Sequence, residues 1–424
     1  MSLQAVLCAS EGHATSADRT SRRMNPEARY GYERGQTWRG YEKCTLTETC
    51  DDDDQRPHLL RHVATTIATA ADVEQLAVIH QGLGQDGPAR EVAWLSCMRF
   101  IVLGGTRFIG RATIDRLHND GHTVLVVHRG ITEPTDLPRV DHLHAERAQL
   151  ADHRLALEAF HADAVLDAIA LTRHDAEAAS AALPARVRLV VLSSMDVYRA
   201  FGALLSGIES DPVPLDEHSP VREQRYPYRG RRPEYEDYDK LDVEDVYARR
   251  QATVLRLPMV YGEHDRQRRE EFILRRVRAG RTRIPVGAGT GLACRGYVGE
   301  IARGICLALT DAWATGETLN LAERQTASMR LWAEQILRAA SSQAQLVRVD
   351  DSVLPPDLQS TGTVSQHLLA DAAKAGRVLG WIHADPSDGL QQSVRWHLAN
   401  PPAEPDPDFD PDDRALASLR SALP

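Results

Sequence analysis

Seven consecutive residues near position 100 have the types and spacing needed to bind phosphate. They are Gly104, Gly105, Thr106, Arg107, Phe108, Ile109 and Gly110. An apolar segment precedes them and an amphipathic segment follows, which predicts a strand-to-helix turn. Gly104 permits the tight turn, Gly110 permits close packing of helix on sheet, and the free amides of the helix N-terminus face an anion. The alternative is a turn that starts a helix without binding a ligand.

The next apolar segment, 123–127, is followed by His128, Arg129 and Gly130. A site for NAD usually has Asp or Glu near this point to hold the ribose 2′-hydroxyl, whereas a cation suits a 2′-phosphate. Arg107, inside the turn, could reach the same phosphate with its planar guanidinium. The sequence therefore favours NADP over NAD, unless both arginines are solvated surface charges.

Lysine is rare in this chain, so each lysine is a candidate for chemistry. Of 50 basic residues, only Lys43, Lys240 and Lys374 are lysines. A surface ion pair between Glu236 and Lys240 would work equally well with arginine, whereas a compact ammonium on a flexible stem suits a narrower set of roles. We therefore expect Lys240 to contact a cofactor.

Short apolar segments alternate with helical ones between residues 98 and 260. The apolar segments are 99–103, 123–127, 164–170, 188–192 and 251–256. This alternation is typical of parallel βαβ units, so we predict an α/β, Rossmann-type doubly wound parallel sheet. Beyond Tyr261 the pattern of helical and apolar segments is mixed. Helices are expected there near 270–277, 298–309 and 329–339.

The two ends of the chain depart from this pattern. Residues 1–97 are polar and predict a poorly structured extension, with an amphipathic helix over 58–79. An alternative in this extension is a metal site of Cys44, Cys50, His58 and His62. Its spacing departs from the zinc pattern, and we expect no metal in the functional site. Residues 401–424 are rich in proline and aspartate and predict a mobile tail.

The overall composition argues against several classes of protein. The 424 residues carry 50 basic and 60 acidic side chains, a net charge of −10, which is unusual for a nucleic-acid binder. There is no apolar run of about 18 residues that could span a membrane. Six cysteines in a chain of this length do not suggest a disulfide framework. The first ten residues lack a basic signal region, so we expect a cytoplasmic protein.

Residues 98–400 resemble the NAD-dependent epimerase/dehydratase family, the extended short-chain dehydrogenases/reductases that act on nucleotide sugars. The resemblance rests on LGGTRFIG at 103–110, Ser193–Tyr198, Lys240–Glu244, Arg256–Gly262, Arg295–Val298 and LGWIHADPSDGLQQSVRWHLANPP at 379–402. The middle glycine of the family's turn is Arg107 here, which is typical of a divergent branch. Members of that branch range from sugar-nucleotide enzymes to RNA-binding or regulatory relatives.

The resemblance implies a Rossmann core at 98–260 and a smaller C-terminal substrate lobe at 261–400, interleaved with that core. It also implies a catalytic Ser–Tyr–Lys group. Ser194 matches the serine that hydrogen-bonds the reacting oxygen, and Lys240 matches the lysine that holds the cofactor ribose and lowers the pKa of the tyrosine. The tyrosine itself is expected four residues before Lys240, where this chain has Glu236. Tyr235 and Tyr238 flank the gap and are the candidates. On a continuous helix neither shares the face of Lys240, but a helix that starts later would leave Tyr235 on a loop.

Further positions follow from the same resemblance. Ala168 and Pro258 are implied near the cofactor, and Tyr198 and Tyr261 near the substrate. Arg295 matches an arginine that binds the diphosphate of a nucleotide sugar, which a bidentate cation suits. Tyr226 and Tyr228, on a long loop that is expected over the pocket, are also within reach of it.

We therefore expect an NADP(H)- or NAD(H)-dependent epimerase, dehydratase or reductase that acts on a nucleotide sugar by hydride transfer. Related enzymes often form dimers, so a homodimer is an open alternative. A second hypothesis is a dinucleotide-binding regulator or RNA-associated protein that has lost the tyrosine, with Arg229–Arg232 and Arg266–Arg276 on the phosphates. A third is a hydrolase or lyase that uses Glu236 as its base.

Overall fold

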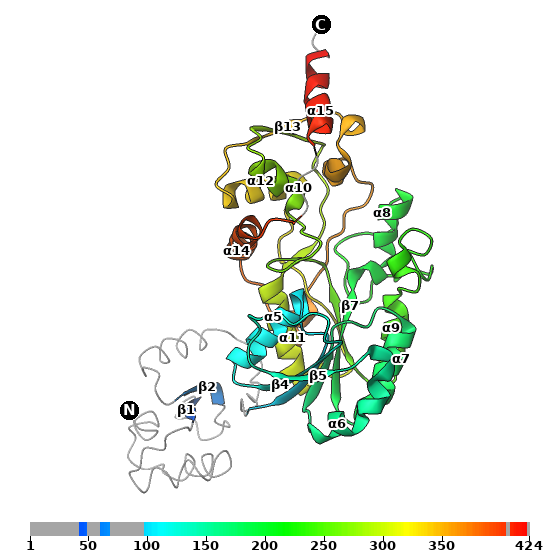
Figure 1. Ribbon diagram of the computed structural model, residues 1–424, viewed down its shortest axis with the longest axis vertical. Helices are drawn as coiled ribbons and strands as arrows, with labels where there is room; N and C mark the ends of the chain where they lie inside the picture. Colours follow the sequence, from blue (N-terminus) through cyan, green and yellow to red (C-terminus); the bar gives the residue numbers. More distant parts are fainter. Residues whose placement is uncertain (1–41, 49–59, 68–96, 404–407, 422–424) are drawn as a thin grey trace, which may run out of the picture. The chain divides into compact units, whose positions relative to one another are not determined.

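The computed structural model describes residues 42–48, 60–67, 97–403 and 408–421 (Figure 1). The chain divides into two compact units, Met1–Ser96 and Cys97–Pro424, and each is described by itself. The limits proposed above for the extension, core, lobe and tail remain predictions.

In the first unit, strand β1 (Glu42–Glu48) pairs antiparallel with strand β2 (Leu60–Ile67). The helix expected over 58–79 is therefore wrong for residues 60–67. Val63, Thr65, Thr66 and Ile67 are β-branched, which favours an extended backbone over a helix. Cys50 and His58, two members of the alternative metal pattern, lie outside the described residues.

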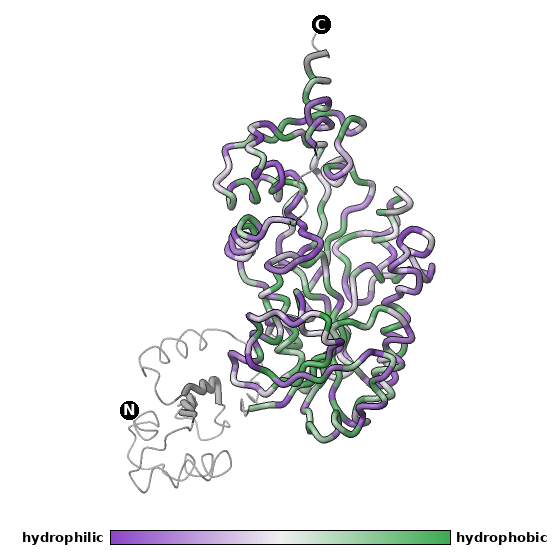
Figure 2. The backbone as a smooth tube through the Cα atoms, viewed as in Figure 1, coloured by the Kyte–Doolittle hydropathy of each residue, from purple (hydrophilic) through white to green (hydrophobic). Residues whose placement is uncertain are grey.

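A seven-stranded parallel sheet forms the centre of the second unit, in the order β12-β8-β7-β6-β3-β4-β5. Its strands are β3 (Arg99–Leu103), β4 (Thr123–His128), β5 (Asp141–His144), β6 (Ala164–Asp167), β7 (Arg188–Ser194), β8 (Thr253–Leu257) and β12 (Thr318–Asn320). The inner strands are buried along almost their whole length and form the hydrophobic centre in Figure 2. The predicted α/β Rossmann-type fold is confirmed.

Helices cover both faces of this sheet (Figure 1). One face packs against α5 (Phe108–Asn119) and α11 (Val298–Thr310), which also contact each other. The other face is covered by 3-10 helix η1 (Arg147–His153) and helices α6 (Arg154–Ala159), α7 (Arg173–Ala182) and α9 (Lys240–Ala248). Over the described residues, none of the helices is both long and apolar enough for a membrane span.

The remaining elements build the C-terminal lobe and the loops above the sheet. Two parallel strand pairs join β9 (Met259–Tyr261) to β11 (Arg295–Tyr297) and β10 (Arg283–Val286) to β13 (Gln345–Arg348). The helices are α8 (Ala203–Ser206), α10 (Glu271–Arg278), α12 (Met329–Ala339), α13 (Ala373–Leu379) and α14 (Pro386–Ala399). The short 3-10 turns are η2 (Met195–Val197), η3 (Arg199–Gly202), η4 (Pro233–Tyr235), η5 (Ala312–Ala314), η6 (Asp351–Val353) and η7 (Pro356–Thr361). Strand β12 joins the central sheet, and helices α11 and α13 pack against its strands.

The expected mobile tail contains a docked helix, α15 (Asp410–Ser421). Arg276 donates to both carboxylate oxygens of Asp412 over 2.7 Å, and both side chains are fully buried. Ala415 on the same helix is 1% exposed in the core of the lobe. The correction has a physical reason: a buried guanidinium needs a buried anion, and the tail supplies it.

This ion pair generates a stability prediction. Asp412→Ala leaves the buried Arg276 with the partly exposed Asp357 as its anionic partner, besides the carbonyl of Phe272. We therefore expect a loss of roughly 3 kcal/mol in the free energy of unfolding. The matched control is Asp413→Ala, which removes an exposed pair with Arg281 and is expected to cost less than about 1 kcal/mol. Urea denaturation measures both, and equal losses would contradict the docking role of Asp412.

Candidate functional site

The turn between β3 and α5 is built so closely that two of its positions require glycine. Gly104 has a φ of +82°, and a Cβ on it would lie 2.2 Å from Cγ2 of Ile169, in the loop after β6. A Cβ on Gly110 would lie 2.2 Å from the carbonyl oxygen of Gly104. Helix α5 therefore begins directly against the end of β3, as a phosphate-binding turn requires.

The N-terminus of α5 has amides to offer to an anion. Arg107 is the N-cap residue, and no described side chain caps the helix by a hydrogen bond at this position. The first turn, Phe108-Ile109-Gly110, contains no acid. Uncapped amides of this kind, together with the helix dipole, fit the pyrophosphate of a dinucleotide. Thr106 is half-buried in this turn, and Ala168, just after β6, donates its amide to the carbonyl of Leu103 at the end of β3 (3.1 Å).

The residues expected near a 2′-phosphate are exposed at the neighbouring strand end. Arg129 follows β4 directly, and Arg107 donates to Thr132 Oγ1 over 2.6 Å. Both residues are exposed, and both lie near the C-terminal end of β4. They are compatible with a phosphate at that point, although Glu133 also contributes a carboxylate nearby.

Lys240 is the first residue of α9 and is buried between two strand ends. Its ammonium donates to the carbonyl oxygens of Ala170 (2.6 Å) and Leu192 (2.8 Å), which lie after β6 and within β7. Asp239 caps the helix by accepting from the amide of Leu241 (2.9 Å) and is itself paired with Arg222. Burial lowers the pKa of Lys240 to about 8. Two of its three protons are used, which leaves one for a further acceptor.

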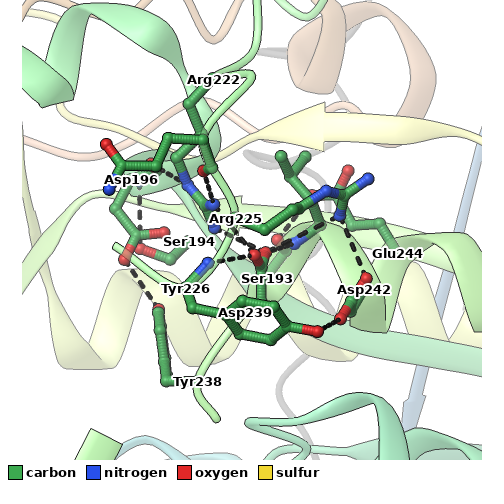
Figure 3. A network of polar contacts seen from close by, with 12 residues as sticks. Ser193, Ser194, Asp196, Arg222, Arg225, Tyr226, Tyr238, Asp239, Asp242 and Glu244 are labelled. Atoms are coloured by element: carbon green, nitrogen blue, oxygen red, sulfur yellow. Dashed lines mark hydrogen bonds and ion pairs between the residues drawn. The ribbon is translucent and has the colours of Figure 1, made fainter. Parts of the chain in front are cut away.

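Tyr238 lies beside Ser194 and Asp196 at the carboxyl end of β7 (Figure 3). The Tyr238 hydroxyl donates to Asp196 Oδ2 over 2.8 Å, and the Tyr228 hydroxyl donates to the same oxygen over 3.1 Å. Ser194 Oγ accepts from the amide of Asp196 (3.2 Å). The structure thus brings Ser194, Tyr238 and the base of α9 together.

The surroundings of Tyr238 differ from those of a tyrosine activated by lysine. Burial, followed by the Asp196 carboxylate, raises the pKa of Tyr238 well above 10, and burial raises the pKa of Asp196. The second carboxylate oxygen, Asp196 Oδ1, is buried and has no hydrogen-bond partner among the described residues. The expectation that Lys240 lowers the pKa of the tyrosine is therefore wrong for Tyr238, because the nearest charge is a carboxylate.

Residues 100–322, more than half of the chain, match the family model of the "NAD dependent epimerase/dehydratase family". The chain belongs to this family. It is also similar to the chloroplast stem-loop binding protein of 41 kDa b from Arabidopsis thaliana. The two are 25% identical over 358 residues, which cover 80% of this chain and 88% of the relative.

Solved structures of family members share the fold. The UDP-glucose-4-epimerase of Stenotrophomonas maltophila, with bound NAD and formylated UDP-arabinopyranose, matches with a TM-score of 0.55 and 20% identity, covering 71% of this chain and 98% of that one. The dTDP-glucose 4,6-dehydratase of Bacillus anthracis, in complex with NAD, has a TM-score of 0.55 and 15% identity, with 72% and 97% covered. At these identities the likeness establishes the fold alone.

This family member departs from the expected catalytic pattern at position 236. Glu236 is exposed, and its carboxylate accepts from the amide of Gly230 over 2.9 Å, so it closes the preceding loop. Helix α9 begins only at Lys240, and Tyr235 and Tyr238 both precede it. Neither tyrosine is on the same helix as Lys240, so helical spacing does not keep them away from it. Tyr235 is half-buried and packs its ring against Tyr238, with centroids 5.6 Å apart.

The three residues expected at the substrate are buried in this structure. Tyr198 is fully buried and donates to Asn320 Oδ1 over 2.7 Å. Arg295 is 1% exposed, donates to the carbonyl of Ala327 (2.8 Å) and lies over the ring of Trp332. Burial lowers its pKa to about 10. Tyr261 is 1% exposed beside it. Pro258, at the junction of β8 and β9, is half-buried. In the described conformation the contacts of Arg295 and Tyr261 support the core of the lobe, whereas Tyr198 packs at the edge of the central sheet against β12. Within the described part of the chain, none of these three hydrogen-bonds to Ser194.

Sequence reasoning missed Asp196, although a signal was present. The carboxylate stands two residues after Ser194, where a central parallel strand ends, and such strand ends form the ligand-binding edge of α/β sheets. Sequence reasoning also missed a second network, which begins at the residue before Ser194. Ser193 donates to Glu244 (2.5 Å), and Glu244 is paired with Arg256 (2.8 Å). Figure 3 shows Ser193 and Glu244 together with Ser194, Asp196 and Tyr238.

Proposed function

We propose that this protein is an NAD(P)-dependent enzyme that acts on a nucleotide sugar by hydride transfer at a sugar carbon. The observation that carries the proposal is the meeting of Ser194, Tyr238 and Lys240 at the carboxyl end of the sheet. Lys240 bonds to the carbonyls of Leu192 on β7 and of Ala170, which follows the Ile169 that covers Gly104 of the glycine turn. Family membership supports the cofactor class. The sugar-nucleotide part is supported by what similar structures contain, such as the UDP sugar in the epimerase of S. maltophila.

The cofactor would be held by residues whose geometry fits it. Gly104, Gly105 and Gly110, with the amides of Phe108 and Ile109, would hold the pyrophosphate. Lys240 has one ammonium proton left for a ribose hydroxyl, and Ala168 and Pro258 would line the nicotinamide side. When bound, the nicotinamide supplies the redox chemistry by taking up or returning a hydride. Arg107 and Arg129 favour NADP over NAD, because guanidinium groups suit a 2′-phosphate.

The protein's own contribution is the handling of a proton at the reacting oxygen. Ser194 and Tyr238 would hydrogen-bond the substrate hydroxyl. Because its pKa is raised, Tyr238 stays protonated at neutral pH and cannot act as a base by itself. It can take the substrate proton only while passing its own proton to Asp196, to which it is already bonded. In the reverse direction the same proton returns through Tyr238, so Tyr238 and Asp196 act as one relay.

A second candidate function is RNA binding, which the similarity to a stem-loop binding protein favours. In the first arginine cluster, Arg231 and Arg232 are exposed, and the guanidinium of Arg229 lies 3.9 Å from the ring centroid of Tyr226. Exposed guanidinium and aromatic groups are suited to phosphates and unpaired bases. The second cluster is less suitable, since four of its arginines are engaged by acids within the protein. These are Arg268, Arg269, Arg275 and Arg276. We place RNA binding second because the net charge is −10.

Cofactor preference is tested by fluorescence titration with NADPH and NADH side by side. We expect NADPH to bind at least about 10-fold more tightly, because the 2′-phosphate gains charge-assisted hydrogen bonds. The double variant Arg107→Ala/Arg129→Ala should lose this advantage and keep its affinity for NADH, whereas the exposed control Arg186→Ala should keep both. A tighter complex with NADH in the wild type would contradict the NADP proposal.

The relay is tested with a panel of UDP- and dTDP-sugars, following the products by chromatography. Tyr238→Phe and Asp196→Asn are each expected to lower kcat by about 100-fold or more, because each breaks the proton path, with cofactor affinity unchanged. Tyr226→Phe is the matched control, since its hydroxyl bonds to Asp242 (3.2 Å) outside the relay. Unchanged turnover in Tyr238→Phe would refute the relay. A wild type that binds cofactor but converts no sugar nucleotide would refute the enzymatic function.

RNA binding is tested by gel shift with a labelled RNA stem-loop over a range of salt concentrations. If it occurs, Arg231→Ala/Arg232→Ala should weaken binding and reduce the slope of log K against log salt by about 1 to 2, from lost phosphate contacts. The control Arg139→Ala/Arg186→Ala removes two exposed arginines elsewhere. The absence of a complex at low salt, or an equal loss in the control, would rule out this surface.

A further inference from the structure

Three histidines and a glutamate meet at the edge of the sheet, apart from the Ser194 group. His142 and His144 alternate on β5, so their side chains share one face of the strand. His128, the last residue of β4, is the register partner of His144, and Glu133 lies on the loop that joins the two strands. One ligand atom from each of these four side chains can be chosen so that all four lie within 4.8 Å of one another.

The contacts within this group join the nitrogen and oxygen atoms that would bind a metal ion. His128 Nε2 lies 2.8 Å from His142 Nδ1 and 3.7 Å from Glu133 Oε1, and His144 Nε2 is bonded to the same carboxylate oxygen. Ligand atoms at about 2.0–2.1 Å from a tetrahedral Zn²⁺ are roughly 3.3 Å apart, so the observed spacing straddles the required one. Small side-chain rotations would bring the ligand atoms to the spacing that a metal ion requires. Such rotations are possible because His142, His144 and Glu133 are exposed.

The tautomer of His128 indicates which side chains ligate first. The amide of Gly130 donates to His128 Nδ1 over 3.1 Å, so a neutral His128 carries its proton on Nε2 and donates it to His142. His142 can therefore offer the lone pair of Nδ1 without a change of tautomer. His144 donates from Nε2 to the Glu133 carboxylate, so its Nε2 becomes a ligand only when that proton moves to Nδ1 or leaves as the metal binds. His128 can then turn its N–H to the Glu133 carboxylate, which is a common supporting contact at metal sites.

We propose that His142, His144 and Glu133, supported by His128, form a binding site for a divalent transition-metal ion. Two imidazoles and one carboxylate are a donor set that suits Zn²⁺, Co²⁺ or Ni²⁺ rather than Mg²⁺ or Ca²⁺. Three protein ligands leave a coordination position open to an outside group. The site lies at the strand end that also carries Arg129, but it does not depend on the proposed enzymatic function.

The test is calorimetric titration of the full, untagged and EDTA-treated chain with ZnCl₂, with the visible spectrum of Co²⁺ as a second readout. We expect His142→Ala/His144→Ala to weaken binding at this site by about 100-fold or more and to abolish the Co²⁺ band, and Glu133→Gln to weaken it less. His118→Ala/His174→Ala removes two exposed histidines from α5 and α7 as the matched control. Cys44→Ser/Cys50→Ser separates any contribution of the N-terminal cysteines.

Retention of binding in both controls and its loss in His142→Ala/His144→Ala would support the proposal. Three results would overturn it: no binding by the wild type at about 100 μM Zn²⁺, unchanged binding in His142→Ala/His144→Ala, or an equal loss in His118→Ala/His174→Ala. Circular dichroism of each metal-free variant shows whether it is folded. Glu133→Gln, a change on an exposed loop, keeps the test valid if the histidine variant is unstable.

Discussion

The proposed site depends first on the contact between the end of β3 and the beginning of α5. The carbonyl of Gly104 occupies the space where any side chain on residue 110 would begin. This approach fixes where the amides of the first helical turn point, and the loop after β6 closes over Gly104 from the neighbouring strand. The positions of the residues proposed to bind the cofactor follow from this turn, because a side chain at residue 104 or 110 would collide with its neighbours.

In the proposed function, the Ser194 group is a reaction site whose electrostatics differ from those that the family resemblance implies. Glu236 stands where that resemblance implies a tyrosine, and Tyr238, just ahead of the later-starting α9, is the proposed source of the hydroxyl. Asp196 then becomes its nearest charged partner, and the lysine is tied to backbone carbonyls. A tyrosine in these surroundings is held in its protonated form, so any base function has to pass to the carboxylate.

Some features could be predicted from the sequence because they depend on local pattern. The inner parallel strands are apolar along nearly their whole length, and Lys240 is one of three lysines among 50 basic residues. The polar edge strand β5 carries no such pattern. Other features arise from distant pairings that no local pattern reveals. Helix α9 begins at Lys240 because Asp239 caps it while paired with Arg222, a residue on a separate loop. The histidines of β4 and β5 meet only because those strands lie side by side. The family resemblance predicts a ligand-binding role for Arg295, but its guanidinium lies over the ring of Trp332 and is buried in the lobe.

The docking of α15 has a practical consequence for work on the minimal protein. The resemblance to the family ends near residue 400, so a shortened chain that stops there is an obvious choice for expression. Such a fragment would lack Asp412 and uncover the apolar surface that Ala415 fills. The guanidinium of Arg276 would then lack the carboxylate of Asp412 and lie next to an exposed apolar surface. If this fragment aggregates, the cause would be the missing helix α15, and the core around the seven-stranded sheet could still be folded.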